Sequence, residues 1–183
     1  PEPVEHVMFA VADERLEAAL DEAIAHGARA ATIMSSLVLA KDREPLLRDR
    51  VLAKIRAAGL VVCGANGMGF YNFADGIWGC GFRTRKHRRG GNVAYISHSG
   101  SGMCGIVDSE ERIDFNLVVS TGQELAVAMD EYLDFALHQP LSLFAVSTMA
   151  RLDPTLETHA LDVLSIVEAT LEDPAAVLMK QLD

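Results

Sequence analysis

Short apolar runs alternate with amphipathic stretches over the first third of the chain. Three runs have the length and composition of buried strands: residues 6–11 (HVMFAV), 28–34 (ARAATIM) and 60–63 (LVVC). Between them, residues 14–26 and 45–58 carry apolar side chains at helical spacing; Asp13 can cap the first of these helices, and Gly27 and Gly59 end the two patterns. Strand, helix, strand, helix, strand in this order predicts a parallel α/β sheet.

The same alternation restarts after residue 90. We predict strands at residues 92–96 and 115–120, and a helix at 103–111. A further helix, opened by Thr121–Glu124, places four apolar residues on one stripe: Leu125, Met129, Leu133 and Leu137. After Pro140 the regular alternation ends, and the sequence predicts a helical segment at 158–171 and a strand-like segment at 175–179. The predicted units are therefore residues 1–82, a basic linker at 83–90, a second α/β unit at 91–140, and fragments of a further unit at 141–183.

Charge and composition narrow the classes of partner. The 183 residues are 50% hydrophobic and carry a net charge of −10, which argues against nucleic acid or an anionic membrane as the main partner. The basic run at 83–89 (RTRKHRR) fits a solvated linker, and a contact with a polyphosphate is the alternative. Nucleic-acid binding is less favoured, because no aromatic residues alternate with these charges. Three cysteines without metal-like spacing indicate reduced thiols, and no apolar stretch approaches the roughly 20 residues of a membrane span. We expect a cytoplasmic protein.

Three glycines follow the third apolar run, in Gly64–Asn72 (GANGMGFYN). Ligands of open parallel sheets collect at the carboxyl ends of the strands, so a binding loop is one interpretation. A tight loop that needs positive φ angles is the other.

A second polar turn, Ser97–Ser101 (SHSGS), joins a predicted strand to a helix. Unpaired amides and the positive end of the helix dipole favour phosphate at such a turn, although Ser99 or Ser101 could equally cap the helix. His98 could carry a phosphoryl group as a nucleophile or could serve only as a hydrogen-bonding residue. A serine hydrolase is not indicated, because the chain has no G-x-S-x-G elbow.

Three segments together resemble the nucleoside-diphosphate-forming acyl-CoA synthetases. Gly64–Phe70 (GANGMGF) is similar to the Gly-Pro-Asn-Cys-x-Gly loop of the CoA-binding domain in succinyl-CoA synthetase α chains and ADP-forming acetyl-CoA synthetases. Gly91–Gly100 (GNVAYISHSG) resembles the strand and Ser-Gln/Arg-Ser-Gly turn that open the second domain of that family. Phe115–Glu124 (FNLVVSTGQE) resembles the strand and Gly-Asn/Gln-Glu turn that come next. The order and rough spacing of the family are kept over residues 6–140.

The resemblance implies a fold and a reaction. The fold would be a partial, parallel-sheet Rossmann-like CoA-binding domain followed by a flavodoxin-like domain of the succinyl-CoA ligase type. The reaction would join a small carboxylic acid to CoA with ATP or GTP and Mg²⁺, through acyl-phosphate and phosphohistidine intermediates. The nucleotide-grasp domain would be another subunit or another part of the protein, and the assembly would be a homo- or hetero-oligomer.

The resemblance also implies site residues. Four would hold phosphate: Ser97, Ser99, Gly100 and Ser101. Four would line the CoA region: Gly64, Asn66, Gly67 and Gly69. His98 is the catalytic candidate on the chemistry of its imidazole alone, since the strand before it matches the family's phosphate-binding segment. The resemblance implies that Glu124 would orient the histidine.

Several departures from the family pattern leave other functions open. Ala65-Asn66-Gly67 replaces Pro-Asn-Cys, and the chain begins midway through the CoA-binding domain, which indicates an incomplete copy. The family's phosphohistidine lies in a later Gly-His-Ala-Gly or Ser-His-Thr-Gly motif, and nothing after Pro140 matches it. A non-catalytic CoA- or acyl-CoA-binding module is therefore the main alternative. A flavodoxin-like electron carrier is a second, although no aromatic pair is placed to sandwich a flavin.

Overall fold

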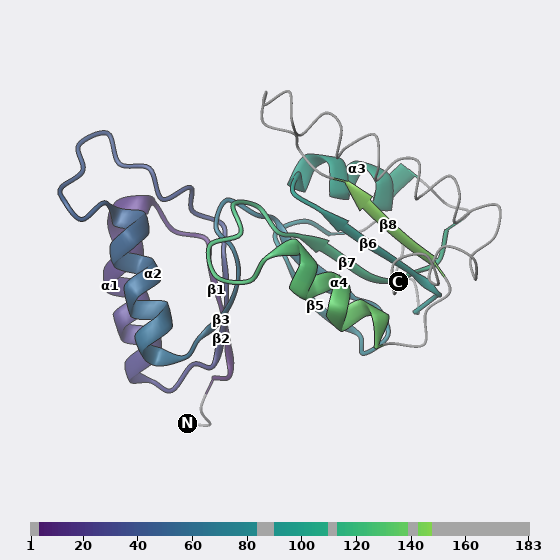
Figure 1. Ribbon diagram of the computed structural model, residues 1–183, viewed down its shortest axis with the longest axis horizontal. Coiled ribbons are helices and arrows are strands. Elements are labelled where there is room, and N and C mark those ends of the chain that lie inside the picture. The colour runs from purple at the N-terminus through teal and green to yellow at the C-terminus, as the bar shows by residue number, and fades with distance from the viewer. Residues whose placement is uncertain (1–3, 84–89, 110–112, 139–142, 148–183) are drawn as a thin grey trace, which may run out of the picture.

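The computed structural model describes residues 4–83, 90–109, 113–138 and 143–147. These residues form two β-sheets with helices packed against them (Figure 1). The predicted mixed α/β class with parallel strands is confirmed.

The first sheet is three-stranded and parallel, in the order β1-β2-β3. Its strands are β1 (His6–Phe9), β2 (Ala30–Ile33) and β3 (Val61–Gly64). Two helices lie side by side against one face: α1 (Asp13–Ala25) and α2 (Leu47–Ala58) (Figure 1). Alternate side chains of the strands, such as Ala31, Ile33 and Val62, join Leu16 and Val51 of the helices in one buried core. Burial of these apolar side chains stabilises the layer at roughly 25 cal/mol per Å² removed from water.

The second sheet has five strands, in the order β5-β4-β7-β6-β8. Its elements are β4 (Gly69–Asn72), β5 (Ile77–Cys80), β6 (Val93–Ser97), α3 (Gly100–Ser109), β7 (Phe115–Ser120), α4 (Met129–Leu137) and β8 (Leu143–Ser147). Strands β7, β6 and β8 run parallel, whereas β4 is antiparallel to both β5 and β7.

Helices α3 and α4 cover opposite faces of this second sheet. Met103 of α3 packs in one cluster with Tyr95 and Val118, whereas Ala136 of α4 packs in another with Ala94 and Val119. Because successive side chains of a strand point to opposite faces, neighbouring residues of β6 and β7 fall into different clusters. Both faces are thereby buried, as expected of a mainly parallel sheet.

The strands predicted up to residue 120 and the first two helices are confirmed, and Gly59 ends α2 in the left-handed conformation with φ of 62°. The capping role predicted for Asp13 is wrong, because Ala12 is the N-cap residue of α1. The Asp13 carboxylate instead accepts hydrogen bonds from the amide of Leu37 and the hydroxyl of Ser36, both at 2.7 Å. This contact ties the loop after β2 to the start of α1.

The helix predicted from Thr121 begins later, at Met129. Leu125 precedes it and is buried in the core of the first sheet, where its amide donates to Gly64 O at 2.8 Å. The predicted apolar stripe is also wrong at its end, because Leu137 is exposed and Ala136 is the buried residue. The contact of α4 with the sheet therefore sets which of its side chains face inward.

The hairpin of β4 and β5 was not predicted, because the glycines around it indicate a loop. The predicted linker is described only at Arg83 and Gly90, and the predicted pieces at 158–171 and 175–179 lie outside the described residues. The domain ranges stay a prediction.

Candidate functional site

The carboxyl ends of β3, β6 and β7 meet where the two sheets adjoin. The amide of Thr121 donates to Ser97 O at 2.8 Å, which joins the turns after β7 and β6. The amide of Gln123 donates to Ala65 O at 2.7 Å, which joins the turn after β7 to the loop after β3. Three loops distant in sequence are thus held together at the edge where parallel sheets bind ligands.

The glycines of the loop after β3 are required by close approaches of backbone. A Cβ atom at Gly64 would lie 2.3 Å from Ile33 O, and one at Gly69 would lie 1.9 Å from Gly79 O. A Cβ at Gly67 would lie 2.7 Å from Ser120 O. Asn66 differs, since it has a positive φ of 54° and an exposed side chain. Of the residues predicted to contact CoA, Asn66 is the one that offers a polar side chain at the surface.

The serine turn after β6 is held by its own hydroxyl groups. Ser97 is fully buried; its hydroxyl donates to Ser99 O and accepts from the amide of Ser99, both at 3.1 Å. The hydroxyl of Ser99 accepts from the amide of Gly102 at 3.1 Å and so caps α3. Ser101 is exposed, and within the described part of the chain the amides of Gly100 and Ser101 have no hydrogen-bond acceptor. Two amide donors without a partner among the described residues therefore lie at the positive end of α3.

His98 and Glu124 form a pair at this turn. Their side chains are 23% and 25% exposed, and His98 Nε2 lies 2.7 Å from Glu124 Oε1. The hydroxyl of Thr121 donates to the same carboxylate oxygen at 3.1 Å. Because β6 and β7 are neighbouring parallel strands, the turns that carry the pair lie beside each other. A carboxylate in contact with an imidazole fixes the orientation of the ring, as in many sites of acid–base or nucleophilic catalysis.

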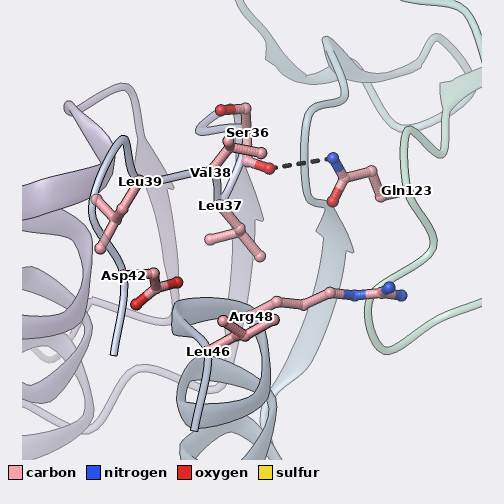
Figure 2. A pocket seen from close by; sticks show the side chains of 8 residues that line it. All are labelled: Ser36, Leu37, Val38, Leu39, Asp42, Leu46, Arg48 and Gln123. Atoms are coloured by element: carbon pink, nitrogen blue, oxygen red, sulfur yellow. Dashed lines mark hydrogen bonds between the residues drawn. The ribbon is translucent and has the colours of Figure 1, made fainter. Parts of the chain in front are cut away.

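A pocket with a volume of about 390 Å³ opens beside the same turn after β7 (Figure 2). It is lined by Ser36, Leu37, Val38, Leu39, Asp42, Leu46, Arg48 and Gln123. The side-chain amide of Gln123 donates to Ser36 O at 3.0 Å, across 87 residues of sequence (Figure 2). Sequence reasoning did not find this pocket. The sequence feature that could have indicated it is the connection of 13 residues between β2 and α2, which is long for a loop between a strand and a helix.

The thiols of Cys63 and Cys104 are not suited to nucleophilic catalysis. Burial raises the pKa of Cys63 to about 11 and that of Cys104 to about 12, so both are protonated near neutral pH. Among the described residues, no group of histidine, cysteine and carboxylate side chains could hold a metal ion, and no helix is long and apolar enough to cross a membrane.

Comparison with solved structures shows the fold. The dinucleotide-forming acetyl-coenzyme A synthetase 1 of Ca. Korarchaeum cryptofilum superposes with a TM-score of 0.69 at 21% identity, over 91% of this chain and 36% of that one. A structure of the same enzyme in complex with phosphate and ADP gives a TM-score of 0.67 at 20% identity, with the same coverage of 91% and 36%. ATP citrate lyase of Methanothrix soehngenii, in complex with citrate and coenzyme A, gives 0.61 at 15% identity, over 78% and 24%. This chain therefore spans little more than a third of the synthetase and shares the fold of that part.

Sequence comparison gives a different kind of match. Residues 85–183, more than half of the chain, match the model of a family described as a domain of unknown function (DUF3516). No curated protein matches the chain.

Proposed function

The chain belongs to the DUF3516 family, and we propose that it is part of an acyl-CoA synthetase that forms a nucleoside diphosphate. The contact of His98 with Glu124, at the positive end of α3, carries this proposal. The enzyme would join a small carboxylic acid to CoA at the expense of ATP or GTP with Mg²⁺. Acyl-phosphate and phosphohistidine intermediates would connect the two half-reactions.

In this proposal His98 accepts the phosphoryl group. A P–N bond forms to the imidazole as the P–O bond to the acyl group or the nucleotide breaks. The carboxylate of Glu124, held by the hydroxyl of Thr121 at 3.1 Å, keeps the ring in one orientation. The unpaired amides of Gly100 and Ser101 would stabilise the phosphate charge, as helix N-termini commonly do.

Ser97 and Ser99 support the phosphate site from behind. Their hydroxyls hold the turn from which the amides of Gly100 and Ser101 would bind phosphate. Coenzyme A would supply the thiol that accepts the acyl group. The exposed side chain of Asn66 would contact it, and Gly64, Gly67 and Gly69 would let the loop backbone pack closely enough to present that side chain.

A non-catalytic CoA- or acyl-CoA-binding module is the second candidate function. This candidate is favoured because the hydroxyls of Ser97 and Ser99 already make hydrogen bonds within the protein. The glycines likewise serve close contacts between backbone segments. In that case His98 and Glu124 would only fasten the turn after β6 to the turn after β7.

Phosphoryl transfer from two donors separates the candidates. The purified protein is incubated with ³²P-labelled acetyl phosphate, and separately with γ-labelled ATP and Mg²⁺, so that the test does not depend on a nucleotide-grasp domain. We expect a label that is stable in base and lost in acid, absent from H98N and formed more slowly in E124Q. H138N, at the exposed residue that caps the C-terminus of α4, is the matched control and should be labelled like the native protein.

Two other results would redirect the proposal. Binding of CoA without any label on histidine would favour the non-catalytic module. Neither label nor binding of CoA, acyl-CoA or phosphate by the folded protein would overturn both functions.

A further inference from the structure

The pocket between the β2–α2 connection and the turn after β7 is lined by an arginine, Arg48, that has no counter-charge in the part of the chain that the structure describes. Arg48 and Arg50 both belong to α2, but their side chains differ. Arg50 lies 3.0 Å from the Glu17 carboxylate and 3.1 Å from that of Asp42. Within the described residues, the guanidinium of Arg48 makes no hydrogen bond or ion pair. In Figure 2 it extends from α2 along one side of the pocket, toward the segment that carries Gln123.

The carboxylate that lines the pocket does not neutralise Arg48. Asp42 accepts hydrogen bonds from the amides of Leu47 and Arg43, both at 2.8 Å, and is paired with Arg50. Its charge is therefore balanced inside the connection. The uncompensated charge of the pocket is positive.

Aliphatic side chains form much of the remaining wall. Leu37 is buried and Leu39 is partly buried, whereas Val38 is 70% exposed and Leu46 is 46% exposed. A ligand that covered the last two would remove apolar surface from water. This contributes about 0.8 kcal/mol, or roughly fourfold in affinity, for each methylene group buried.

The pocket is held open by contacts on both sides. The backbone amide of Leu37 donates a hydrogen bond to the Asp13 carboxylate, and the side-chain amide of Gln123 donates one to Ser36 O. The opposite side is fixed by the bonds of Asp42 to the start of α2. A ligand would thus meet walls already in place and would lose little affinity to ordering them. The volume of about 390 Å³ is within the range of about 300–1,000 Å³ found for small-molecule sites.

We propose that this pocket binds an anionic ligand with an aliphatic chain, its oxyanion on Arg48 and its chain over Leu37, Val38 and Leu46. The guanidinium group matches carboxylate and phosphate alike, since both offer two oxygens to its parallel N–H groups. Gln123 precedes Glu124 in the chain, so an occupant would lie beside the turn that carries the His98 partner. The site stands on its own contacts and does not depend on phosphorylation of His98.

Binding of four simple probes tests the ligand class by isothermal titration. Hexanoate and hexyl phosphate carry both features, hexanol lacks the charge, and acetate lacks the chain. We expect at least one of the first two to bind about tenfold or more tightly than hexanol and acetate. The tighter of the two identifies the headgroup. Failure of both to bind the native protein would overturn the proposal.

Three variants test the residues. R48Q should weaken binding of the charged probe about tenfold, and L46S should weaken it while leaving acetate unaffected. R56Q, an exposed arginine in the last turn of the same helix, is the matched control and should bind like the native protein. Equal affinity of R48Q and R56Q would overturn the assignment. H98N should bind the probe normally, so that loss of the phosphoryl-transfer function and loss of this pocket are distinguishable.

Discussion

Gly67 and Gly122 bring two loops of the molecule into backbone contact. A Cβ atom at Gly122 would lie 2.1 Å from Ala65 O and 2.6 Å from Gly67 N, and the residue has a positive φ of 61°. Neither neighbour is a flexible side chain that could move aside. The spacing between the turn after β7 and the loop after β3 therefore depends on the absence of a side chain at this residue.

We expect G122A to destabilise the protein by more than about 2 kcal/mol, since the left-handed conformation alone costs a residue with a side chain roughly 1–2 kcal/mol. Urea unfolding gives the measurement. G105A is the matched control, because a Cβ there meets nothing within 4 Å inside α3. It should stabilise the helix by roughly 0.5–1 kcal/mol. An equal change in both variants would contradict this account of the contact.

Strands β1 and β2 are joined by side chains as well as by their ladder. His6 Nε2 lies 3.0 Å from Thr32 Oγ1 on the face opposite the two helices, and the ring packs edge-on against Phe70 of β4. Burial lowers the pKa of His6 below its ordinary value of 6.5. The folded protein therefore takes up this proton less readily than the unfolded chain does.

Neutral His6 stabilises the folded protein above about pH 6.5, and this stabilisation is lost as the pH falls below that value. We expect the urea midpoint of the native protein to fall between pH 7.5 and pH 5.5, and to fall less in H6Q. Parallel pH profiles for the two proteins would show that His6 carries no part of the effect.

The elements differ in how far sequence could predict them. The first sheet follows from local patterns, because its strands are short apolar runs and Gly59 marks a helix end. The hairpin of β4 and β5 does not, because β4 is specified by pairing with β7 more than forty residues later. Likewise, Leu125 fits a helical stripe but is buried in the core of the other sheet. Tertiary contacts override local preference at both places.

The candidate site divides in the same way. The turn after β6 was predicted because a strand, serines and a helix are adjacent in sequence. The proximity of His98 and Glu124 requires β6 and β7 to be neighbours, which the family resemblance implied and the spacing alone did not. The pocket is lined by Arg48 and Gln123, which are far apart in the sequence. No local sequence pattern could predict that these two residues lie together.

The two sheets share contacts that should make them unfold together. Leu125 reaches from the second unit into the first core, and the amide of Met68 donates to the hydroxyl of Ser120 at 3.1 Å. Cys63 of β3 packs in the cluster that α4 covers. Loss of the first sheet would therefore remove support from the second.

Leu16 of α1 provides a test at a distance from the second sheet. It is fully buried, so L16A should destabilise the protein by about 2–5 kcal/mol. Trp78, the single tryptophan of the chain, lies in β5 of the second sheet and reports that sheet by fluorescence. We expect its unfolding transition and the far-UV circular dichroism transition to shift together. A fluorescence transition unchanged by L16A would show two independent units.

The position of the β4–β5 hairpin in the sequence has a practical consequence. β4 and β5 precede residue 84, whereas β6 and β7 follow residue 92, yet all four belong to one sheet. A backbone cut made within residues 84–89 would leave part of that sheet on each fragment, and each fragment would expose the strand edge that the other covers. The two pieces would then be complementary halves of a split protein, whose reassembly could report when two fused partners meet.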